Sequence, residues 1–326
     1  MKMKRLNVAA LAVVPALMLA ASPVNAAKIF VSNERDNTVT VVDSDSLEVL
    51  KTIETGRRPR GIVISPDNKE VFVCLGDDNV VGVIDADKLE VVRELDSGPD
   101  PELMDVSPDG KTIYIANEDD SMVTVMKPDS GERIVEVPVG VEPEGMRVSP
   151  DGTVTVATSE SSSMAHFIDT ATNELIANVL VDTRPRHAEW QPDGQRVWVS
   201  SEVGGTVSVI DGSTHEIVKV IGFEIPGVSP EQIQPVGMRF SKDGKKLFVA
   251  LGPANRVAVI NPDTFEVENY VLVGQRPWHL EVHPDGSKLY VANGLTNDMT
   301  VVDIATLKPE KSVPVGRLPW GIAIQP

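Results

Sequence analysis

Short apolar segments, each flanked by turn-forming residues, follow one another along almost the whole chain. One representative stretch predicts four strands, over residues 61–64, 70–75, 80–84 and 89–95. Their β-branched residues favour strands, and the Gly, Pro, Asp and Asn residues between them adopt turn conformations at little cost. Several predicted strands have two apolar residues in a row instead of a strict alternation of apolar and polar residues. This pattern is typical of a sheet packed between two others. No segment shows a sustained helical period.

The four-strand unit recurs with a regular spacing. A proline returns in a similar context every 42 residues, with one step of 50, at Pro59, Pro101, Pro143, Pro185, Pro235, Pro277 and Pro319. A turn motif such as Ser107-Pro-Asp-Gly keeps the same spacing. A repeat of about 40–45 residues is the length of one propeller blade. The sequence therefore predicts an all-β fold, a seven-bladed β-propeller of four-stranded antiparallel blades.

The two ends of the chain look like parts of one blade. Residues 28–33 match the second strand of the other repeats, and residues 321–324 match the first strand. We therefore expect the last blade to take its first strand from the C-terminus and its other three from the N-terminus. Such closure leaves no exposed edge at the junction. It predicts a single propeller domain over residues 27–326.

The first 26 residues predict a secretory signal peptide. Lys2, Lys4 and Arg5 precede an apolar run over residues 6–21, and Ala26 ends a small-residue cleavage site. An uncleaved anchor helix is the alternative, but a proline interrupts the run and the run is short for a membrane span. No later segment is apolar for long enough to cross a membrane. We therefore expect export to a bacterial periplasm.

The charge and the cysteine content narrow the class of function. The chain has 48 acidic and 30 basic residues, a net charge of −18, which becomes −21 without the signal peptide. Nucleic acid and anionic lipid are repelled by such a chain, so neither is expected as a partner. Its one cysteine, Cys74, lies in an apolar strand, which indicates a buried and inert thiol. Without a Cys-x-x-Cys-His motif, no covalently attached cofactor is expected.

The loops before the repeated prolines differ from repeat to repeat, whereas the Asp-Gly turns are uniform. Because the strands of a blade alternate in direction, these variable loops all lie at one end of the channel. Variable loops on a rigid scaffold are where ligand sites usually lie. Their charges suit an anionic or aromatic ligand held between arginines, or a cation held by carboxylates. Alternatively, they face water and satisfy local backbone groups. The candidate ligand-binding residues are Arg58, Arg60, Glu102, Glu144, Arg184, Arg186, His187, Arg276, Trp278, His279, Arg317 and Trp320.

Two histidines stand out among these candidates. His187 and His279 occupy a position where four other repeats have glycine, and they lie two blades apart. Together they could bind a metal or a haem-like ligand at the channel mouth. The alternative is that each is separately hydrogen-bonded.

The step of 50 residues carries an insertion over residues 222–234. Pro226, Pro230 and the following Pro235 restrict its backbone, and four apolar residues make it unlike a solvated loop tip. We expect it to fold over the channel mouth as a partial lid or a docking surface. The alternative is an insertion packed on its own blade.

Several motifs, such as Tyr114-Ile-Ala-Asn and the Val-Thr-Val that follows it, resemble those of exported YVTN-repeat propellers. Residues 56–61, 116–120, 223–237 and 250–259 are similar to the PQQ-dependent catabolism-associated propeller family. This resemblance implies a setting in PQQ-dependent alcohol oxidation, with a periplasmic dehydrogenase or cytochrome as partner. It implies no particular reaction. A single cysteine cannot supply the vicinal pair of the quinoprotein dehydrogenases, so the chain is not expected to be the quinoprotein itself.

These observations favour an exported, non-catalytic β-propeller that binds a ligand or a protein as an accessory factor. The alternative is a cofactor-carrying or hydrolytic propeller, lactonase-like or haem d1-type, that uses the channel mouth. A nucleic-acid-binding propeller is a third alternative, which the charge disfavours. The chain lacks Gly-x-Ser-x-Gly, His-Glu-x-x-His and phosphate-binding glycine motifs, although propeller enzymes assemble sites from separate blades.

Overall fold

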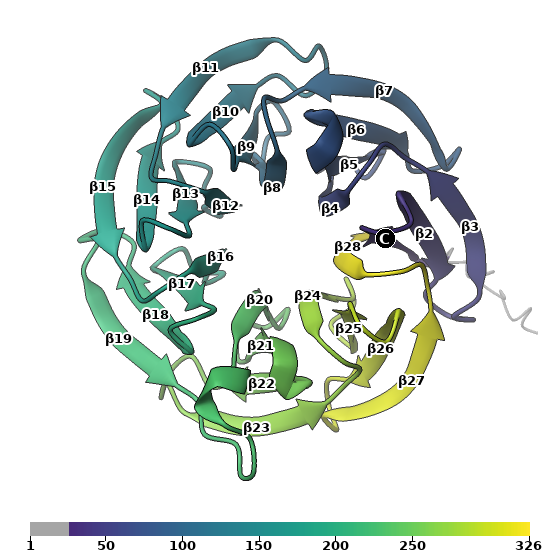
Figure 1. Cartoon of the computed structure of the whole chain (residues 1–326), viewed down its shortest axis with the longest axis vertical. Coiled ribbons are helices and arrows are strands. Elements are labelled where there is room, and N and C mark those ends of the chain that lie inside the picture. Colours follow the sequence, from purple (N-terminus) through teal and green to yellow (C-terminus); the bar gives the residue numbers. More distant parts are fainter. Residues whose placement is uncertain (1–25) are drawn as a thin grey trace, which may run out of the picture.

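The repeats fold into seven four-stranded antiparallel sheets, which stand as blades around a central axis (Figure 1). The computed structural model describes residues 26–326, so the signal peptide predicted over residues 1–26 lies, except for Ala26, outside the described residues. Within this part the chain forms strands and turns with three 3-10 turns and no α-helix, which confirms the predicted fold class. No helix of residues 26–326 has the length and apolar character that crossing a membrane requires.

The blades follow one another in chain order. The first blade contains β4 (Pro59–Ile64), β5 (Glu70–Leu75), β6 (Val80–Asp85) and β7 (Glu90–Asp96). The second contains β8 (Pro101–Val106), β9 (Ile113–Asn117), β10 (Met122–Met126) and β11 (Arg133–Pro138). The third contains β12 (Pro143–Val148), β13 (Val154–Ser159), β14 (Met164–Asp169) and β15 (Glu174–Leu180). The fourth contains β16 (Pro185–Trp190), β17 (Arg196–Ser201), β18 (Thr206–Asp211) and β19 (Ile217–Gly222).

The remaining blades keep the same order. The fifth contains β20 (Pro235–Phe240), β21 (Leu247–Leu251), β22 (Arg256–Ile260) and β23 (Val267–Leu272). The sixth contains β24 (Pro277–Val282), β25 (Lys288–Asn293), β26 (Asp298–Asp303) and β27 (Lys308–Pro314). The seventh contains β28 (Pro319–Gln325), β1 (Lys28–Asn33), β2 (Thr38–Asp43) and β3 (Val49–Glu54). The 3-10 turns are η1 (Gly76–Asp78), η2 (Pro230–Gln232) and η3 (Gly252–Ala254).

The seventh blade joins the two ends of the chain, as the sequence predicted. β28 pairs antiparallel with β1, with Ile324 opposite Ile29 and Ala323 opposite Phe30. At the end of this ladder, Lys28 Nζ donates to Gln325 Oε1 at 3.0 Å. The ring is therefore closed by main-chain hydrogen bonds.

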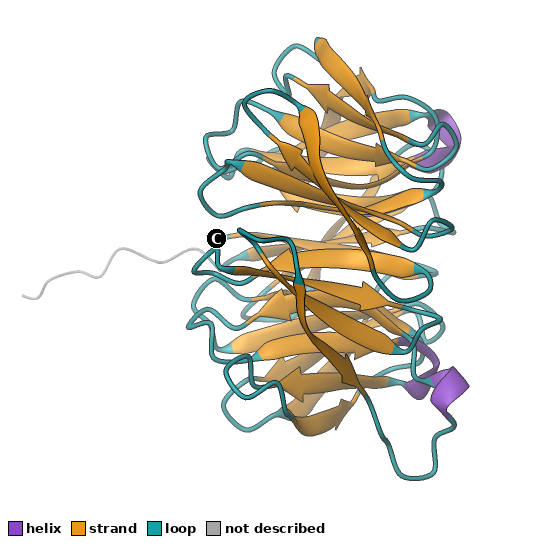
Figure 2. Cartoon of the chain, turned by 90° about the vertical axis from the view of Figure 1, so that its left-hand side faces the viewer, coloured by secondary structure: helices purple, strands orange, loops and turns teal. Residues whose placement is uncertain are grey.

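Because the strands of each blade alternate in direction, their connections lie on two different faces of the ring. The loops from the second to the third strand and those before each innermost strand share one face, which we call the loop face. All three 3-10 turns lie on it, to the right in Figure 2. The Asp-Gly turns and the C-terminus lie on the opposite face, which we call the turn face.

The hydrophobic core lies between adjacent blades. Between the first two blades, for example, Phe72 and Cys74 pack against Met104 and Ile115, all buried. Burial raises the pKa of the Cys74 thiol, so it stays protonated and unreactive, as its strand context predicted. Each blade thus uses both faces of its sheet to contact a neighbour, which explains the paired apolar residues in the sequence.

The uniform Asp-Gly turns are structural. In the second blade, Ser107 Oγ donates to Asp109 Oδ1 at 2.7 Å and accepts from the Thr112 amide at 3.0 Å. Gly110 has a φ of 72°, which suits glycine. The same serine and aspartate contact recurs at Ser149 and Ser241. These turn residues are therefore committed to fixing the innermost strand to the second strand.

The insertion does not cover the central axis, so the predicted lid is wrong. Ile225 and Ile233 are buried among Trp198 and other side chains of the fourth and fifth blades. The Glu224 amide donates to Tyr270 Oη of the outer strand β23 at 3.2 Å. Figure 1 shows this segment at the outer rim of the ring. Its apolar residues fill the groove between two blades, where burial stabilises them more than an exposed mouth would.

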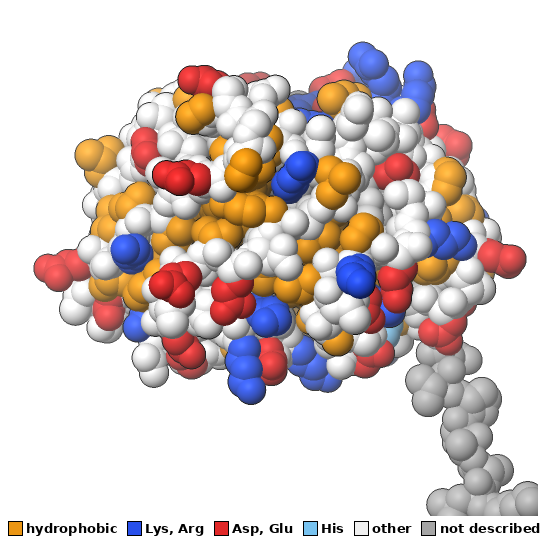
Figure 3. Space-filling model, turned by 90° about the horizontal axis from the view of Figure 1, so that it is seen from below, with side chains coloured by type: hydrophobic (Ala, Val, Ile, Leu, Met, Phe, Trp, Pro, Cys, Tyr) orange, Lys and Arg blue, Asp and Glu red, His pale blue; other side chains and the backbone are white. Residues whose placement is uncertain are grey.

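The outer strands expose apolar side chains, among them Ile217, Val218 and Val220 of β19. Figure 3, a view onto the side of the ring, shows such side chains interspersed with charged ones. Charged residues along outer strands discourage pairing with a second sheet.

Deleting residues 320–326 should destroy cooperative folding. The deletion removes the buried side chains of Trp320, Ile322 and Ile324, each contributing about 1.5–3 kcal/mol, and leaves the inner edge of β1 without its partner strand. That loss is comparable with the total stability of a typical domain, about 5–15 kcal/mol. Thermal unfolding followed by circular dichroism should show no transition, or one lowered by more than about 10 °C. Deleting only the exposed Pro326 is the control, and an unchanged melting temperature for the longer deletion would contradict closure.

Candidate functional site

The innermost strands place side chains at equal heights along the central axis. These strands are β4, β8, β12, β16, β20, β24 and β28, and neighbours contact one another all the way round the ring. Residues one repeat apart therefore meet across each blade boundary. From the loop face to the turn face, the side chains form a charged layer, a histidine layer and a cavity.

The charged layer begins with a buried carboxylate between two arginines. Glu102 is fully buried, and both of its oxygens accept from Arg60 NH1, at 2.8 and 2.7 Å. Arg58 NH2 donates to the same carboxylate at 2.5 Å, and Arg58 NH1 donates to Asp100. The two arginines lower the pKa of Glu102 against the opposing effect of burial. These predicted ligand-binding residues therefore bind one another.

The layer continues around the fourth and sixth blades. Arg186, itself buried, lies 2.9 Å from Glu144 Oε1 and also pairs with Glu160. Arg184 pairs with Glu160 at 2.8 Å and with Glu202 at 3.2 Å. Arg276 joins at the other side, with its NH2 2.6 Å from Glu202 Oε1. Ion pairs within this layer therefore satisfy most of the charged side chains that were predicted to lie at the channel mouth.

The aromatic candidates lie within the same layer. The Arg276 guanidinium lies 4.2 Å from the centre of the Trp278 ring, and that of Arg186 lies 5.6 Å from it. Arg60 lies 5.8 Å from the Trp320 ring. Such cation–π contacts stabilise the arginines where they are. Arg317 is separate, because its side chain is 62% exposed and its Nε contacts Asp36 Oδ1 at 2.5 Å.

Carboxylates gather beside this network. Asp100, Glu102 and Glu118 each offer an oxygen within 4.8 Å of the others, and Glu118, Glu142 and Glu160 form a second such group. Burial, a hydrogen bond to Glu102 and the charge of Glu102 raise the pKa of Glu118 to about 8. Glu118 therefore holds a proton at neutral pH. A cation at this place would compete with that proton and with Arg58.

The structure brings His187 and His279 together, but in the interior of the ring rather than at the channel mouth. Their ring centres lie 5.3 Å apart, and His279 lies 4.2 Å from the Trp320 ring. Both side chains are buried in the middle of the ring, and burial lowers the pKa of each. Both are therefore neutral imidazoles at pH 7. Neither belongs to the carboxylate groups that could hold a metal.

A tetrapyrrole does not fit beside these histidines. The cavity that touches both has a volume of about 20 Å³, which is room for a single water molecule. His187 Nδ1 and His279 Nε2 have no hydrogen-bond partner within residues 26–326. An ordered water in this space would satisfy them better than a metal, because Arg239 NH1 lies 3.4 Å from His187 Nε2.

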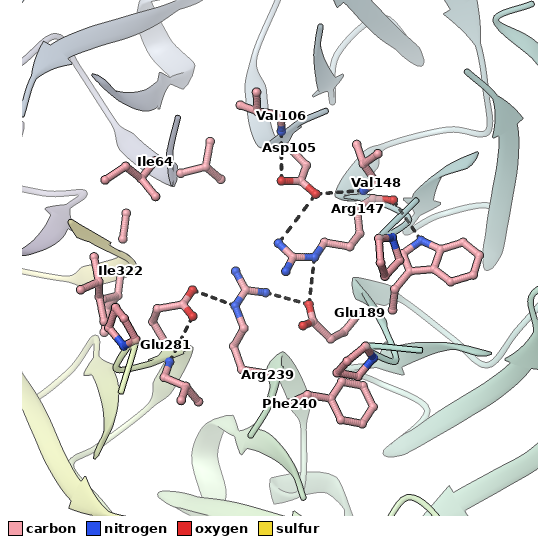
Figure 4. A pocket seen from close by; sticks show the side chains of 18 of the residues that line it. Ile64, Asp105, Val106, Arg147, Val148, Glu189, Arg239, Phe240, Glu281 and Ile322 are labelled. Carbon is pink, nitrogen blue, oxygen red and sulfur yellow. Dashed lines mark hydrogen bonds and ion pairs between the residues drawn. The ribbon is translucent and has the colours of Figure 1, made fainter. Parts of the chain in front are cut away.

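A much larger cavity opens at the turn face. It has a volume of about 540 Å³ and lies between the innermost strands of all seven blades (Figure 4). Five charged residues occupy the fifth position of successive innermost strands and form an arc on one side: Asp105, Arg147, Glu189, Arg239 and Glu281. Val63 and Ala323 take the same position in the other two blades. The cavity therefore has a charged side and an apolar side.

The arc is a chain of ion pairs. Arg239 lies 2.7 Å from Glu281 Oε2 and 2.8 Å from Glu189 Oε2. Arg147 Nε lies 3.2 Å from the same Glu189 oxygen, and its NH1 lies 3.7 Å from Asp105. The two arginines lower the pKa of the buried Glu189 to about 2 against the effect of burial. Two guanidinium groups are thus held side by side by one carboxylate.

The arc was not predicted from the sequence, because it lies within strands rather than in the variable loops. Comparison of the seven innermost strands at their fifth position would have revealed five charges where a buried strand should carry apolar residues.

Comparison with known families agrees with this architecture. Residues 6–118 match the model of the YNCE-like beta-propellers, and residues 168–311 match that of the "Lactonase, 7-bladed beta-propeller" family. The chain is similar to both of these propeller families. Neither match is specific to the PQQ-associated propellers. The comparison with curated proteins gives no match.

Solved structures show the same fold at low sequence identity. Hydrazine synthase of Kuenenia stuttgartiensis has a TM-score of 0.79 at 22% identity, over 85% of this chain and 92% of that one. A functionally unknown protein of Desulfotomaculum acetoxidans has a TM-score of 0.79 at 18% identity, over 91% and 98%. The dihydro-heme d1 dehydrogenase NirN in complex with DHE has a TM-score of 0.68 at 18% identity, over 95% and 77%.

Substituting Arg186 should cost far more stability than substituting Arg317. Arg186→Met leaves Glu144 buried without an ion-pair partner and removes one of the two arginines paired with Glu160, which costs about 3–5 kcal/mol. Arg317→Met removes an exposed ion pair worth less than about 1 kcal/mol. Urea unfolding monitored by tryptophan fluorescence measures both. Equal losses would show that Arg186 does not belong to a buried network of ion pairs.

Glu118→Gln should change how stability depends on pH. A carboxyl whose pKa is raised by folding adds stability that is fully present below about pH 4.3 and lost as pH rises through about 8. The glutamine amide does not titrate. The melting temperature of the variant, relative to that of the native chain, should therefore increase as the pH rises from 5 to 9. The exposed Glu54→Gln is the control and should keep a constant difference. A constant difference for Glu118→Gln as well would refute the raised pKa.

Proposed function

We propose that the chain is an exported, non-catalytic propeller that binds a small ligand in the turn-face cavity. The observation that carries this proposal is the 540 Å³ cavity with two adjacent arginines, Arg147 and Arg239, in its lining. Its volume falls in the range of about 300–1,000 Å³ typical of small-molecule sites. The loop-face residues support the proposal indirectly, since their charges are already paired with one another.

The chemistry of the lining favours binding over catalysis. Ser149 Oγ and Ser241 Oγ donate to the aspartates of their own turns, at 2.7 Å each. Lys242 Nζ donates to the Pro284 carbonyl at 2.6 Å. The groups that could act as nucleophiles are therefore engaged in the scaffold. The serine hydrogen bond lowers the pKa of each of these aspartates, which makes them weak bases for activating a nucleophile.

The proposed setting is the periplasm and PQQ-dependent alcohol oxidation. The charged start and apolar run of residues 1–26 support export. The resemblance of four segments to the PQQ-associated propellers supports the link to alcohol oxidation. In this setting the protein would serve a periplasmic dehydrogenase or cytochrome as a binding partner or ligand carrier.

A lactonase-like hydrolase is the second candidate. The lactonase match over residues 168–311 spans the blades that supply Glu189, Arg239 and Glu281 to the cavity. A carboxylate there could activate water against a lactone whose carbonyl accepts from an arginine. Lactone hydrolysis followed by pH-stat titration distinguishes the two functions, and turnover lost in Glu281→Gln would favour the hydrolase.

Ligand capture tests the proposed function directly. Protein purified from the periplasm of the native host should release a small molecule on denaturation, detectable by mass spectrometry. The double variant Arg147→Gln, Arg239→Gln should release at least about ten-fold less, because it lacks the donors of the cavity. Arg133→Gln, on the outer strand β11, should behave like the native chain. Equal release from all three proteins would place the ligand elsewhere.

A growth experiment tests the setting separately. A strain without the gene should grow more slowly on a primary alcohol and normally on an organic acid. The native chain and the Arg133→Gln variant should restore growth on the alcohol, and the double variant should not. Normal growth of the deletion strain on alcohols would remove the PQQ link but leave the binding function in place.

A further inference from the structure

We propose that the ligand of the turn-face cavity is a small carboxylate with an apolar body. Arg147 and Arg239 hold its carboxylate, and the apolar side of the cavity holds its body. This inference rests on the proposed function and adds the ligand's chemical class and orientation.

The two guanidinium groups are adjacent. Arg147 Nε and Arg239 NH1 lie 3.2 and 2.8 Å from the same atom, Glu189 Oε2. In Figure 4 both groups stand in the middle of the pocket rather than against its wall. Their side chains are 26% and 15% exposed, so a molecule in the cavity can reach them. The geometry therefore offers one anion two guanidinium groups.

The cavity has more free donors than free acceptors. Asp105 accepts from the Val106 and Val148 amides at 3.0 and 2.9 Å, and Glu281 accepts from the Val282 amide at 3.1 Å. These carboxylates also pair with the arginines. A guanidinium has five N–H donors, and the NH2 groups of Arg147 and Arg239 have no partner within residues 26–326. A ligand that completes the site must therefore bring acceptors.

The charges of the lining do not oppose an anion. Three carboxylates, from Asp105, Glu189 and Glu281, are balanced by Arg147, Arg239 and Lys242. A carboxylate matches guanidinium N–H groups in pairs, and such charge-assisted bonds are stronger than neutral ones. A cationic ligand would instead meet the unpaired N–H donors directly.

The opposite side of the cavity is apolar. Val63 and Ala323 replace the charged residues of the arc, and Ile64, Ile322 and Ile324 extend this side. Figure 4 shows Ile64 and Ile322 across the pocket from the arginines. Free inorganic phosphate or acetate would leave this surface wet, whereas an apolar body would bury it. The two sides together select a molecule that is anionic at one end only.

Calorimetry at pH 7 with four probes tests the proposal. Benzoate carries both features, benzamide keeps the body without the charge, acetate keeps the charge without the body, and inorganic phosphate is an anion without a body. Benzoate should bind at least about ten-fold more tightly than each of the others. Binding of acetate or phosphate as tight as that of benzoate would overturn the role of the apolar side. Equal binding of benzamide would overturn the role of the carboxylate.

Two variants assign the binding to this cavity. Arg147→Gln should weaken benzoate binding about ten-fold or more and leave benzamide binding unchanged. Val63→Asp should weaken benzoate similarly while leaving the ion pairs of the arc intact, because a carboxylate already occupies this position in other blades. Arg133→Gln is the control, and melting curves verify that each variant is folded. Unchanged benzoate binding in both variants would overturn the proposal.

The outcomes also separate this inference from the proposed function. A neutral or cationic molecule released from the native protein, with no benzoate binding, would refute the ligand class and keep the binding function. No released molecule and no binding of any probe would refute both.

Discussion

Seven innermost strands converge on one axis, and this convergence decides what every charged residue near the axis does. Arg60 meets Glu102 and Arg239 meets Glu281, in each case 42 positions further along the chain. A charge at this place cannot be solvated freely, so it must find a partner in the next blade or face a cavity. Near the loop face most of the charged side chains are paired with one another. Near the turn face two guanidinium groups retain free N–H donors, and the space in front of them is open. The free N–H donors of these two arginines are therefore what distinguishes the turn-face cavity from the paired layer at the loop face.

The repeat made the fold predictable to the level of single strands, including the pairing of residues 28–33 with the C-terminal strand. The period is a property of the sequence alone, and so is the complementarity of the ends. The sequence alone does not show which groups face each other across a blade boundary, because that depends on the offset between neighbouring sheets. Arg58 and Glu102 were both singled out correctly as lying at one mouth, but nothing in the loops showed that they pair. Arg147 was missed because it alternates with apolar neighbours as an ordinary strand residue does. The insertion at 222–234 was misplaced because the groove that accepts Ile225 and Ile233 forms only between folded blades.

The histidine layer separates the two ends of the ring. His187 and His279 occupy the middle, packed against Trp320 of the charged layer, with space for about one water molecule. Burial keeps both imidazoles neutral, and the guanidinium of Arg239 beside His187 disfavours a cation there. A molecule in the turn-face cavity therefore enters and leaves by the same side. The loop face, with its internally paired charges, is separated from this cavity by the histidine layer.

The seventh blade has a consequence for the order in which the molecule is made. β1, β2 and β3 are the first strands to be synthesised, and the strand that completes their sheet is the last. Until then Lys28–Asn33, a mostly buried strand in the finished protein, presents an unpaired edge to its surroundings. Contacts this distant in sequence form late and slow the search for the native state. This sheet thus stays open while the six other blades are synthesised, a period in which a chaperone would have most to protect.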